Sequence, residues 1–175
     1  MARTRTRKDQ IKRRAKHKAD QGKPMQLKQW SSPILGKTVK EVPDQAAAIK
    51  LPIKRMIATC QKENGVGLAA NQVGLDARVV VIAVDHRSAF YMINPKIDKA
   101  SDELVSGKEG CLSYPRIFAD VERSKEIEVT WRDLNWKLHR QTFKDYDARV
   151  IQHELDHLDG ICKVGDEWRR QKENA

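Results

Sequence analysis

The sequence predicts an α+β fold built mainly from antiparallel β-sheet. Segments with β-strand patterning outnumber helical ones, and they do not alternate with helices as they do in parallel βαβ folds. Two of them follow each other closely enough to form a hairpin. With 175 residues, 39% of them hydrophobic, the chain is long enough for one domain with a real core and short for two. No apolar run approaches the roughly 20 residues of a membrane span, so we expect a soluble protein without membrane contact.

Residues 1–24 form a basic N-terminal arm. They contain ten Lys or Arg against two Asp, a formal charge of +8 out of +10 for the whole chain. We expect the arm to be flexible in isolation, because it has little apolar surface to bury. An organellar transit peptide is the alternative, although serine is absent and no amphipathic stripe is visible. Met25 follows the arm directly, so translation from Met25 would omit it.

The first half of the predicted domain contains one helix between two irregular segments. Residues 27–44 are broken by Ser-Ser-Pro and Gly, which predicts an extended segment with a turn. Residues 44–64 place apolar side chains at helical spacing, with Asp44 as N-cap and Pro52 as a kink or a new start. The small residues of 63–74 predict a loop.

Four strands are predicted after this loop. The β-branched run at 77–85 predicts a buried strand, and residues 89–95 predict a second one that ends at Asn-Pro. Residues 126–131 and 136–143 alternate like the two strands of a hairpin. We expect Asn135 to take the positive φ that such a turn often needs.

The last predicted helix spans residues 145–160. Asp145 or Asp147 is its expected N-cap, and Gly160 is its expected C-terminal stop. Residues 166–175 are expected to form a short charged tail, so that no full amphipathic helix follows.

This helix contains the stretch QHELDH, with two histidines four residues apart. On a helix, His153 and His157 project from the same face one turn apart, as two imidazoles must to bind one metal ion. Glu154 points about 100° around the helix. It can therefore act on water beside the metal as an acid or base without being a ligand.

The usual protease completions of this motif are weak here. A metzincin site needs a third histidine where the chain has Lys163, and the downstream Glu167 and Glu173 lie in the charged tail. The third ligand is therefore expected upstream, at Cys111 in KEGCLSYP, next to Gly110. One thiolate with two imidazoles leaves an open position for water, as catalytic sites do, and suits iron(II), zinc, nickel or cobalt.

The other two cysteines, Cys60 and Cys162, are interpreted as small buried hydrophobic residues. Three cysteines cannot all pair within one chain, and nothing indicates secretion. We therefore expect free thiols in a reducing compartment.

Three ordered motifs make the sequence resemble the peptide deformylase family. GVGLAANQ (65–72), EGCLS (109–113) and QHELDH (152–157) match the family's GxGLAAxQ, EGCLS and QHExDH in order and with similar spacing. The resemblance covers roughly residues 25–162. It implies a catalytic domain at 25–165, in which mainly antiparallel β-sheets pack around a central helix that carries the HExxH motif.

By this resemblance the chain is a metallohydrolase that removes the N-formyl group from the N-terminal formylmethionine of nascent polypeptides and releases formate. One divalent metal ion per chain, iron(II) natively in many members, is held by Cys111, His153 and His157. The metal lowers the pKa of bound water, and the resulting hydroxide attacks the formyl carbon. Glu154 is the implied general acid/base.

The resemblance also assigns residues around the metal. The side-chain amide of Gln72 and the backbone N–H of Leu112 stabilise the oxyanion, and the backbone of Gly67 pairs with the extended substrate. Glu109 and Arg123 form a buried ion pair that supports the cysteine segment. The pocket for the substrate methionine and its surroundings are formed by Val66, Tyr146, Val150 and Gly110.

The implied partner is an N-formylmethionyl peptide, and we expect a cytoplasmic monomer in a bacterial or phage-infected cell. The short C-terminus resembles that of some phage-encoded members and puts in doubt ribosome docking through a C-terminal helix. The basic arm, or the RRQK cluster at 169–172, is the hypothesised substitute that attracts ribosomal RNA.

Two other classes of protein are alternatives. A zinc peptidase would hydrolyse an internal peptide bond, and a basic RNA-binding module with a structural metal would bind nucleic acid without turnover. Neither class gives the first two motifs a task.

Overall fold

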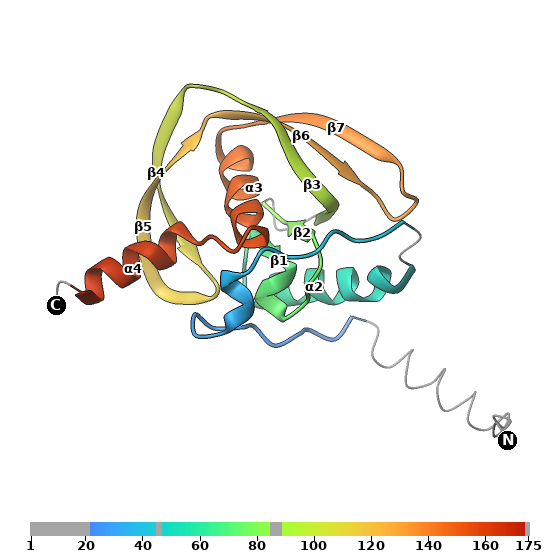
Figure 1. Cartoon of the computed structure of the whole chain (residues 1–175), viewed down its shortest axis with the longest axis horizontal. Coiled ribbons are helices and arrows are strands. Elements are labelled where there is room, and N and C mark those ends of the chain that lie inside the picture. Colours follow the sequence, from blue (N-terminus) through green and yellow to red (C-terminus); the bar gives the residue numbers. More distant parts are fainter. Residues whose placement is uncertain (1–21, 45–46, 85–88, 174–175) are drawn as a thin grey trace, which may run out of the picture.

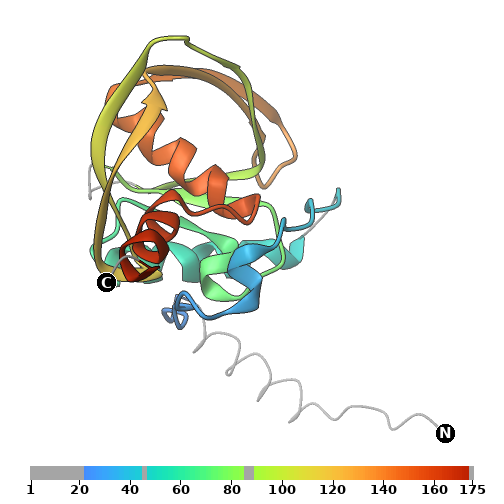
Figure 2. The same cartoon turned by 60° about the vertical axis from the view of Figure 1, so that its left-hand side comes forward.

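Helix α3 (Asp145–Leu158) lies between two antiparallel sheets whose strands curve around it (Figures 1 and 2). This computed structural model describes residues 22–44, 47–84 and 89–173, so most of the basic arm at 1–24 falls outside the described residues. The larger sheet has the order β1-β2-β3-β6-β7, with β1 (Gly67–Ala69), β2 (Val79–Ile82), β3 (Phe90–Ala100), β6 (Glu126–Arg132) and β7 (Leu138–Lys144). The smaller sheet is the hairpin β4–β5. The predicted α+β class is confirmed.

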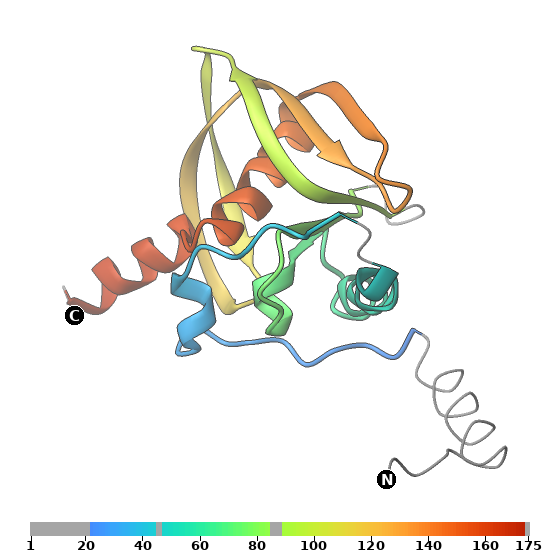
Figure 3. The same cartoon turned by 45° about the vertical axis from the view of Figure 1, so that its right-hand side comes forward.

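Strand β2 separates two hydrophobic cores. Because successive residues of a strand face opposite sides, Val80 and Ile82 join the core around α3, whereas Val79 and Val81 join the core around α2 (Lys50–Lys62). Figure 3 shows α2, viewed nearly end-on, and α3 on opposite sides of β1 and β2. The strand is buried on both faces, which explains its continuous β-branched run.

The strand predicted to end at Asn-Pro instead continues as β3. Its pairing with β6 shifts register between Ile93 and Lys96. Pro95, which has no N–H to donate, therefore lies where the ladder is interrupted. Asn94 takes a φ of +50° there, and its side-chain amide exchanges two hydrogen bonds of 2.8 Å with the main chain of Val42. The Asn-Pro signal marks an irregularity within the strand and not its end.

The hairpin predicted near the C-terminal helix forms as β6–β7. Its positive φ is taken by Trp136, at +64°, and not by Asn135. Asp133 stabilises the turn, because its Oδ1 accepts hydrogen bonds from the N–H groups of Asn135 and Lys137 at 2.8 and 3.0 Å.

A second hairpin, β4 (Leu104–Cys111) with β5 (Tyr114–Ser124), has no counterpart among the predicted strands. Strand β4 is polar along most of its length, and one of the few buried residues of β5 is the charged Arg123. Neither strand therefore shows an apolar alternation. The hairpin matters for the site because β4 ends at Cys111.

Three segments predicted between residues 27 and 74 also differ in the structure. Helix α2 follows the 3-10 turn η2 (Ala47–Ile49), so Pro52 lies in its first turn, where proline is tolerated, and Asp44 is not its N-cap. A further 3-10 turn, η1 (Pro33–Gly36), occupies part of the segment predicted to be extended. The predicted loop at 63–74 contains strand β1 and the 3-10 turn η3 (Ala70–Val73).

Helix α3 ends as predicted but begins differently. Lys144 is its N-cap, and Asp145 and Asp147 lie within the first turn, where the helix dipole favours carboxylates. At the other end Gly160 has φ of +75°, and the N–H of the next residue, Ile161, donates to the carbonyl of Asp156 at 2.8 Å. This is a Schellman motif, which satisfies carbonyls that the helix leaves unpaired.

Residues 163–173 form helix α4 (Lys163–Glu173), although the sequence predicts a charged tail from residue 166. Val164 is fully buried against β5, and the ring centroid of Trp168 lies 6.1 Å from that of Tyr114 and 4.8 Å from that of Trp30. So few apolar positions give no periodicity that could be recognised in the sequence. No helix in the described part of the chain is long and apolar enough to cross a membrane.

Candidate metal centre and active site

The side chains of Cys111, His153 and His157 converge, although they come from β4 and α3. Their candidate ligand atoms all lie within 4.8 Å of one another, and Cys111 Sγ is 3.2 Å from His157 Nε2. The two imidazole centroids are 5.0 Å apart. One thiolate and two imidazoles at this spacing fit a single divalent ion with a position left for water or substrate.

The two histidines are oriented in different ways. His153 Nδ1 lies 2.9 Å from Glu109 Oε2, which places the proton on Nδ1 and leaves Nε2 for a metal ion. Burial lowers the pKa of His153, but its hydrogen bond to Glu109 and the nearby carboxylates outweigh burial and raise the pKa. His157 is fully buried, and this burial lowers its pKa well below the ordinary value, so it stays neutral. Its Nδ1 has no hydrogen-bond partner among the described residues.

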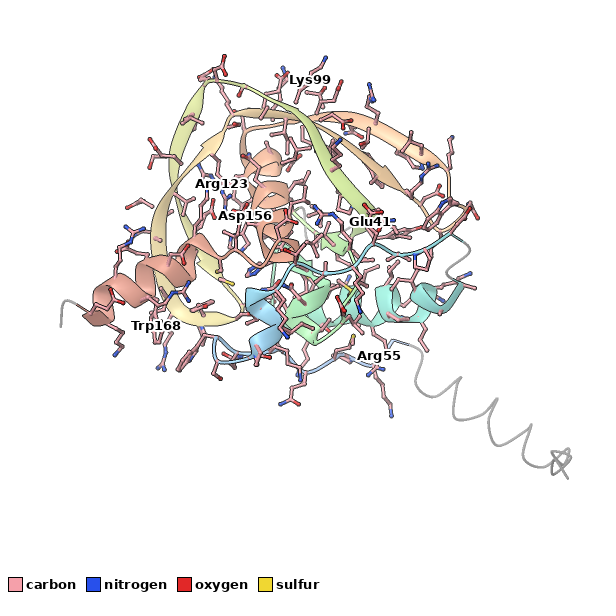
Figure 4. All side chains as sticks on the ribbon, in the orientation of Figure 1. Glu41, Arg55, Lys99, Arg123, Asp156 and Trp168 are labelled. Carbon is pink, nitrogen blue, oxygen red and sulfur yellow. The ribbon has the colours of Figure 1, made fainter. Side chains whose placement is uncertain are left out.

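Glu109 and Arg123 meet as a buried bidentate pair. Arg123 Nε and Nη2 each donate to one oxygen of Glu109 at 3.0 Å, and Arg123 Nη1 donates to Asp156 of α3. Figure 4 shows Arg123 and Asp156 side by side between the β4–β5 hairpin and α3. Burial opposes ionisation of Glu109, but the hydrogen bonds from His153 and Arg123 outweigh it and lower its pKa to about 2. Glu109 is therefore ionised at neutral pH.

Glu154 lies beside the ligands and is 4% exposed. Burial raises its pKa to about 7. Its Oε2 has no hydrogen-bond partner among the described residues, although the side chain lines a cleft. Gly67 of β1 lies directly against the Glu154 side chain. A Cβ at position 67 would be only 2.8 Å from Glu154 Cγ, so a larger residue would collide with it.

The side chain of Gln72 is buried with its amide nitrogen directed at the ligands. Its Oε1 accepts a hydrogen bond from the N–H of Ala69 at 2.9 Å, so Nε2 must be the atom that faces Ser113 Oγ (3.3 Å) and Cys111 Sγ (3.6 Å). Leu112 follows Cys111 in the turn between β4 and β5 and lines the same cleft. Gln72 Nε2 is therefore a potential donor beside the Cys111 sulfur, and Leu112 is the next residue in the chain.

The cleft beside the ligands has a volume of about 580 Å³. The residues expected around the substrate methionine all line it: Val66, Gly110, Tyr146 and Val150. Val150 is buried and Tyr146 is 53% exposed, which places the tyrosine at the rim. A Cβ at Gly110 would be 3.0 Å from the ring of Phe118, so this ring forms the wall over Gly110.

Three contributors to the site are absent from the sequence-based assignments: Arg149, Asp156 and Cys162. Arg149 and Asp156 could have been found, because they share the helix face of His153 at spacings of four and three residues. Cys162 is buried as predicted, but it also lies against Cys111. Contact between the two sulfurs raises the pKa of Cys111 and lowers that of Cys162 to about 7.

The fold and this site define a metal-dependent hydrolase of the HExxH type, with a cysteine as the third candidate ligand. The comparisons with known proteins agree with this class. Residues 24–173 match the family model described as Polypeptide deformylase. The peptide deformylase of Thermotoga neapolitana is 41% identical over 135 residues, covering 77% of this chain and 82% of that protein. A peptide deformylase of Synechocystis is 37% identical over 145 residues, covering 81% and 78%.

Solved structures give the same result. The crystal structure of peptide deformylase from Thermotoga maritima superposes with a TM-score of 0.78 at 38% identity, covering 81% of this chain and 95% of that chain. The Met-Ala-Ser-bound peptide deformylase from Acinetobacter baumannii superposes with a TM-score of 0.77 at 32% identity, covering 82% and 98%. The chain belongs to the peptide deformylase family. It is a metal-dependent hydrolase that removes the N-formyl group from nascent peptides.

Proposed function

We propose that Cys111, His153 and His157 hold the catalytic metal ion and that Glu154 transfers the proton in deformylation. The observation that carries this assignment is the meeting of three ligand atoms within 4.8 Å beside the buried carboxylate of Glu154, one oxygen of which has no hydrogen-bond partner among the described residues. Iron(II) is the proposed native metal, with zinc, nickel or cobalt as alternatives that the same donors accept. When bound, the ion supplies the Lewis acidity that makes water a nucleophile near neutral pH.

Glu154 is the proposed general base and then general acid. Its carboxylate takes a proton from the attacking water and returns it to the amine nitrogen as the formyl C–N bond breaks, so formate and a free amino terminus are released. A pKa of about 7 suits both transfers near neutral pH.

Gln72 Nε2 and the N–H of Leu112 are the proposed donors to the oxyanion that develops on the formyl oxygen. Gln72 suits this role because Ala69 already occupies its Oε1 and the surrounding protein buries it. A donor held in place before the reaction needs no reorganisation when the charge develops.

An N-formylmethionyl peptide is the proposed substrate, extended along Gly67 with its methionine among Val66, Gly110, Tyr146 and Val150. The walls of the cleft support this placement, because apolar side chains such as Leu112 and Ile117 line it together with the polar groups of the site. The Acinetobacter baumannii enzyme crystallised with Met-Ala-Ser gives further support, since that tripeptide has the sequence of a deformylated product.

Formate release from formyl-Met-Ala-Ser by anaerobically purified protein tests the assignment. Wild type is expected to release formate and Glu154→Ala to lose most of this activity, with Glu122→Ala, an exposed glutamate of β5, as the matched control. Metal content of the same samples is expected to fall in Cys111→Ala and to persist in Glu154→Ala. Full activity of Glu154→Ala, or full metal content of Cys111→Ala, contradicts the assignment.

We also propose that the protein is a cytoplasmic monomer. A second proposal concerns nucleic acid: the basic arm at 1–24, with the RRQK cluster at 169–172, attracts ribosomal RNA. The charge of +8 on the arm supports the second proposal. Co-sedimentation of the full chain and of residues 25–175 with ribosomes at low and high salt tests it. Equal, salt-independent binding of both contradicts it, and a dimer in light scattering contradicts the monomer.

A further inference from the structure

Arg149 of α3 directs its guanidinium group at the β4–β5 hairpin. The side chain is 11% exposed. Its Nη1 donates to Glu109 Oε1 and to the carbonyl of Val121, both at 2.7 Å, and lies 3.3 Å from the carbonyl of Gly107. Its Nη2 donates to the carbonyl of Val105. One arginine therefore links the metal-binding helix to both strands of the hairpin.

The sequence of β4 leaves space for this group. A Cβ at Gly107 would lie 2.9 Å from Arg149 Cζ, so the guanidinium lies directly on the backbone of Gly107. An alanine there would displace Arg149 without removing it. The position of the Arg149 guanidinium therefore depends on the absence of a side chain at Gly107.

Arg149 also acts on the metal ligands through Glu109. Oε1 of Glu109 accepts hydrogen bonds from Arg149 and Arg123, and Oε2 accepts from Arg123 and His153. The orientation of Glu109, which sets the tautomer of His153, depends on both arginines. Cys111 lies two residues after Glu109 on the same strand. Arg149 is thus connected to a ligand on α3 and to the ligand on β4.

Hydrogen bonds join the hairpin to several residues of α3: Arg149, Gln152, His153 and Asp156. Arg149 lies one turn before His153 and contacts β4 and β5, whereas Asp156 lies after it and contacts Arg123 of β5. Gln152 bonds the main chain of Ser124 in β5, whereas His153 directly, and Asp156 through Arg123, reach β4 by way of the Glu109 side chain. Arg149 differs from these residues because it bonds main-chain carbonyls of β4, the strand that ends at Cys111.

We propose that Arg149 is a positioning residue of the metal centre, which holds Cys111 and His153 at metal-binding distance by bonding β4, β5 and Glu109 together. The inference rests on the proposed ligand set. It predicts weaker and geometrically altered metal binding when the contact is lost, and not merely a less stable fold.

The test compares cobalt(II) binding by wild type, Arg149→Met, Arg149→Lys and Gly107→Ala. Arg140→Met is the control, because Arg140 is a solvent-exposed arginine of β7. Affinity is measured by competition with a chromophoric chelator, and ligand geometry by the thiolate-to-cobalt charge-transfer and d–d bands. Unfolding of each metal-free protein is followed separately. We expect Arg149→Met to bind about 10–100-fold more weakly with shifted bands, the range typical for the loss of a group that orients a ligand.

Arg149→Lys and Gly107→Ala should show the same spectral change at smaller amplitude, since lysine lacks the planar fork and alanine displaces it. These two variants decide the matter if Arg149→Met does not fold. Wild-type affinity and bands in the folded variants, with only a lower unfolding temperature, overturn the inference and make Arg149 a purely structural residue. Failure of wild type to give a thiolate-to-cobalt band would instead overturn the proposed ligand set.

Discussion

Gly67 and Glu154 fit together so closely that a Cβ at position 67 would lie 2.8 Å from Cγ of the glutamate. Gly67→Ala should therefore displace the proposed general base. We expect kcat to fall by at least about 10-fold, within the 10²–10⁴ that a general base can contribute, while the bound metal remains. Steady-state formate release and metal content measure this. Gly36→Ala is the control, because a Cβ there meets nothing within 4 Å. An unchanged kcat in Gly67→Ala would show that the carboxylate moves without consequence.

The metal-free protein should become less stable as the pH rises from about 4.5 to about 7, with no further loss from this group at higher pH. Burial raises the pKa of Glu154 from 4.5 to about 7. The contribution of protonated Glu154 to the free energy of unfolding is fully present below pH 4.5. It is lost as the pH rises through 7, which costs on the order of 3 kcal/mol of stability. Glu154→Gln carries no charge, so its stability relative to wild type should grow across this window. Urea unfolding with a chelator present measures both proteins. Parallel pH profiles would contradict the expectation.

Arg123→Met should destabilise the fold strongly, because it leaves the buried Glu109 without one of its cations and Asp156 without its partner. Breaking a buried pair from one side typically costs about 3–5 kcal/mol. Lys125→Met removes the exposed ion pair with Glu103 and should leave stability close to wild type. Urea unfolding of the two variants measures the difference. Equal loss in both would mean that the buried network adds nothing beyond a surface charge.

The three thiols should respond differently to metal removal. Burial raises the pKa of Cys60 to about 12, so iodoacetamide should leave it unmodified at pH 8 with or without metal. Cys111 is protected while it binds the ion, but in metal-free protein the contact with Cys111 lowers the pKa of Cys162 to about 7, so that a thiolate is present in this pair at pH 8. We expect iodoacetamide to label the pair Cys111 and Cys162 at least about 10-fold faster after the metal is removed with a chelator. Peptide mass mapping measures the labelling of each cysteine. Equal labelling of Cys60 and Cys111 would refute this.

The sequence predicts the parts of the fold and site that depend on local periodicity. His153 and His157 share a face because they are four residues apart on a helix, and β2 is recognisable because both its faces are buried. Gly160 ends α3 because glycine adopts the positive φ of a Schellman motif. Cys111 is expected as the third ligand because the usual downstream completions of the motif are weak, and the three ordered motifs then support it.

The remaining features depend on partners that are distant in the sequence. Glu109 and Arg123 are buried because residues of α3 pair with them. The charged residues of β4 and β5 therefore predict solvent-exposed segments, and the two strands are not recognised from the sequence. The Asn-Pro dipeptide of β3 predicts the end of a strand. The strand continues because the Asn94 side chain is held there by hydrogen bonds to the main chain of Val42, which is distant in the sequence. The contact of Gly67 with Glu154 requires β1 to lie against α3, which no local pattern encodes.

Replacing Gln72 should separate its proposed role in the transition state from a role in metal binding. Gln72→Glu keeps an acceptor for the N–H of Ala69 but removes the Nε2 donor, whereas Gln72→Leu removes both. We expect kcat to fall about 10²–10³-fold in both variants, the usual loss for one oxyanion donor. KM should change little, because the donor acts on charge that is absent from the ground state. Gln61→Leu, at an exposed glutamine of α2, is the control. Initial rates over a range of formyl-Met-Ala-Ser concentrations, with metal content measured on the same samples, provide the test. A fall in bound metal that matches the fall in kcat would assign Gln72 to the support of Cys111 instead of the oxyanion.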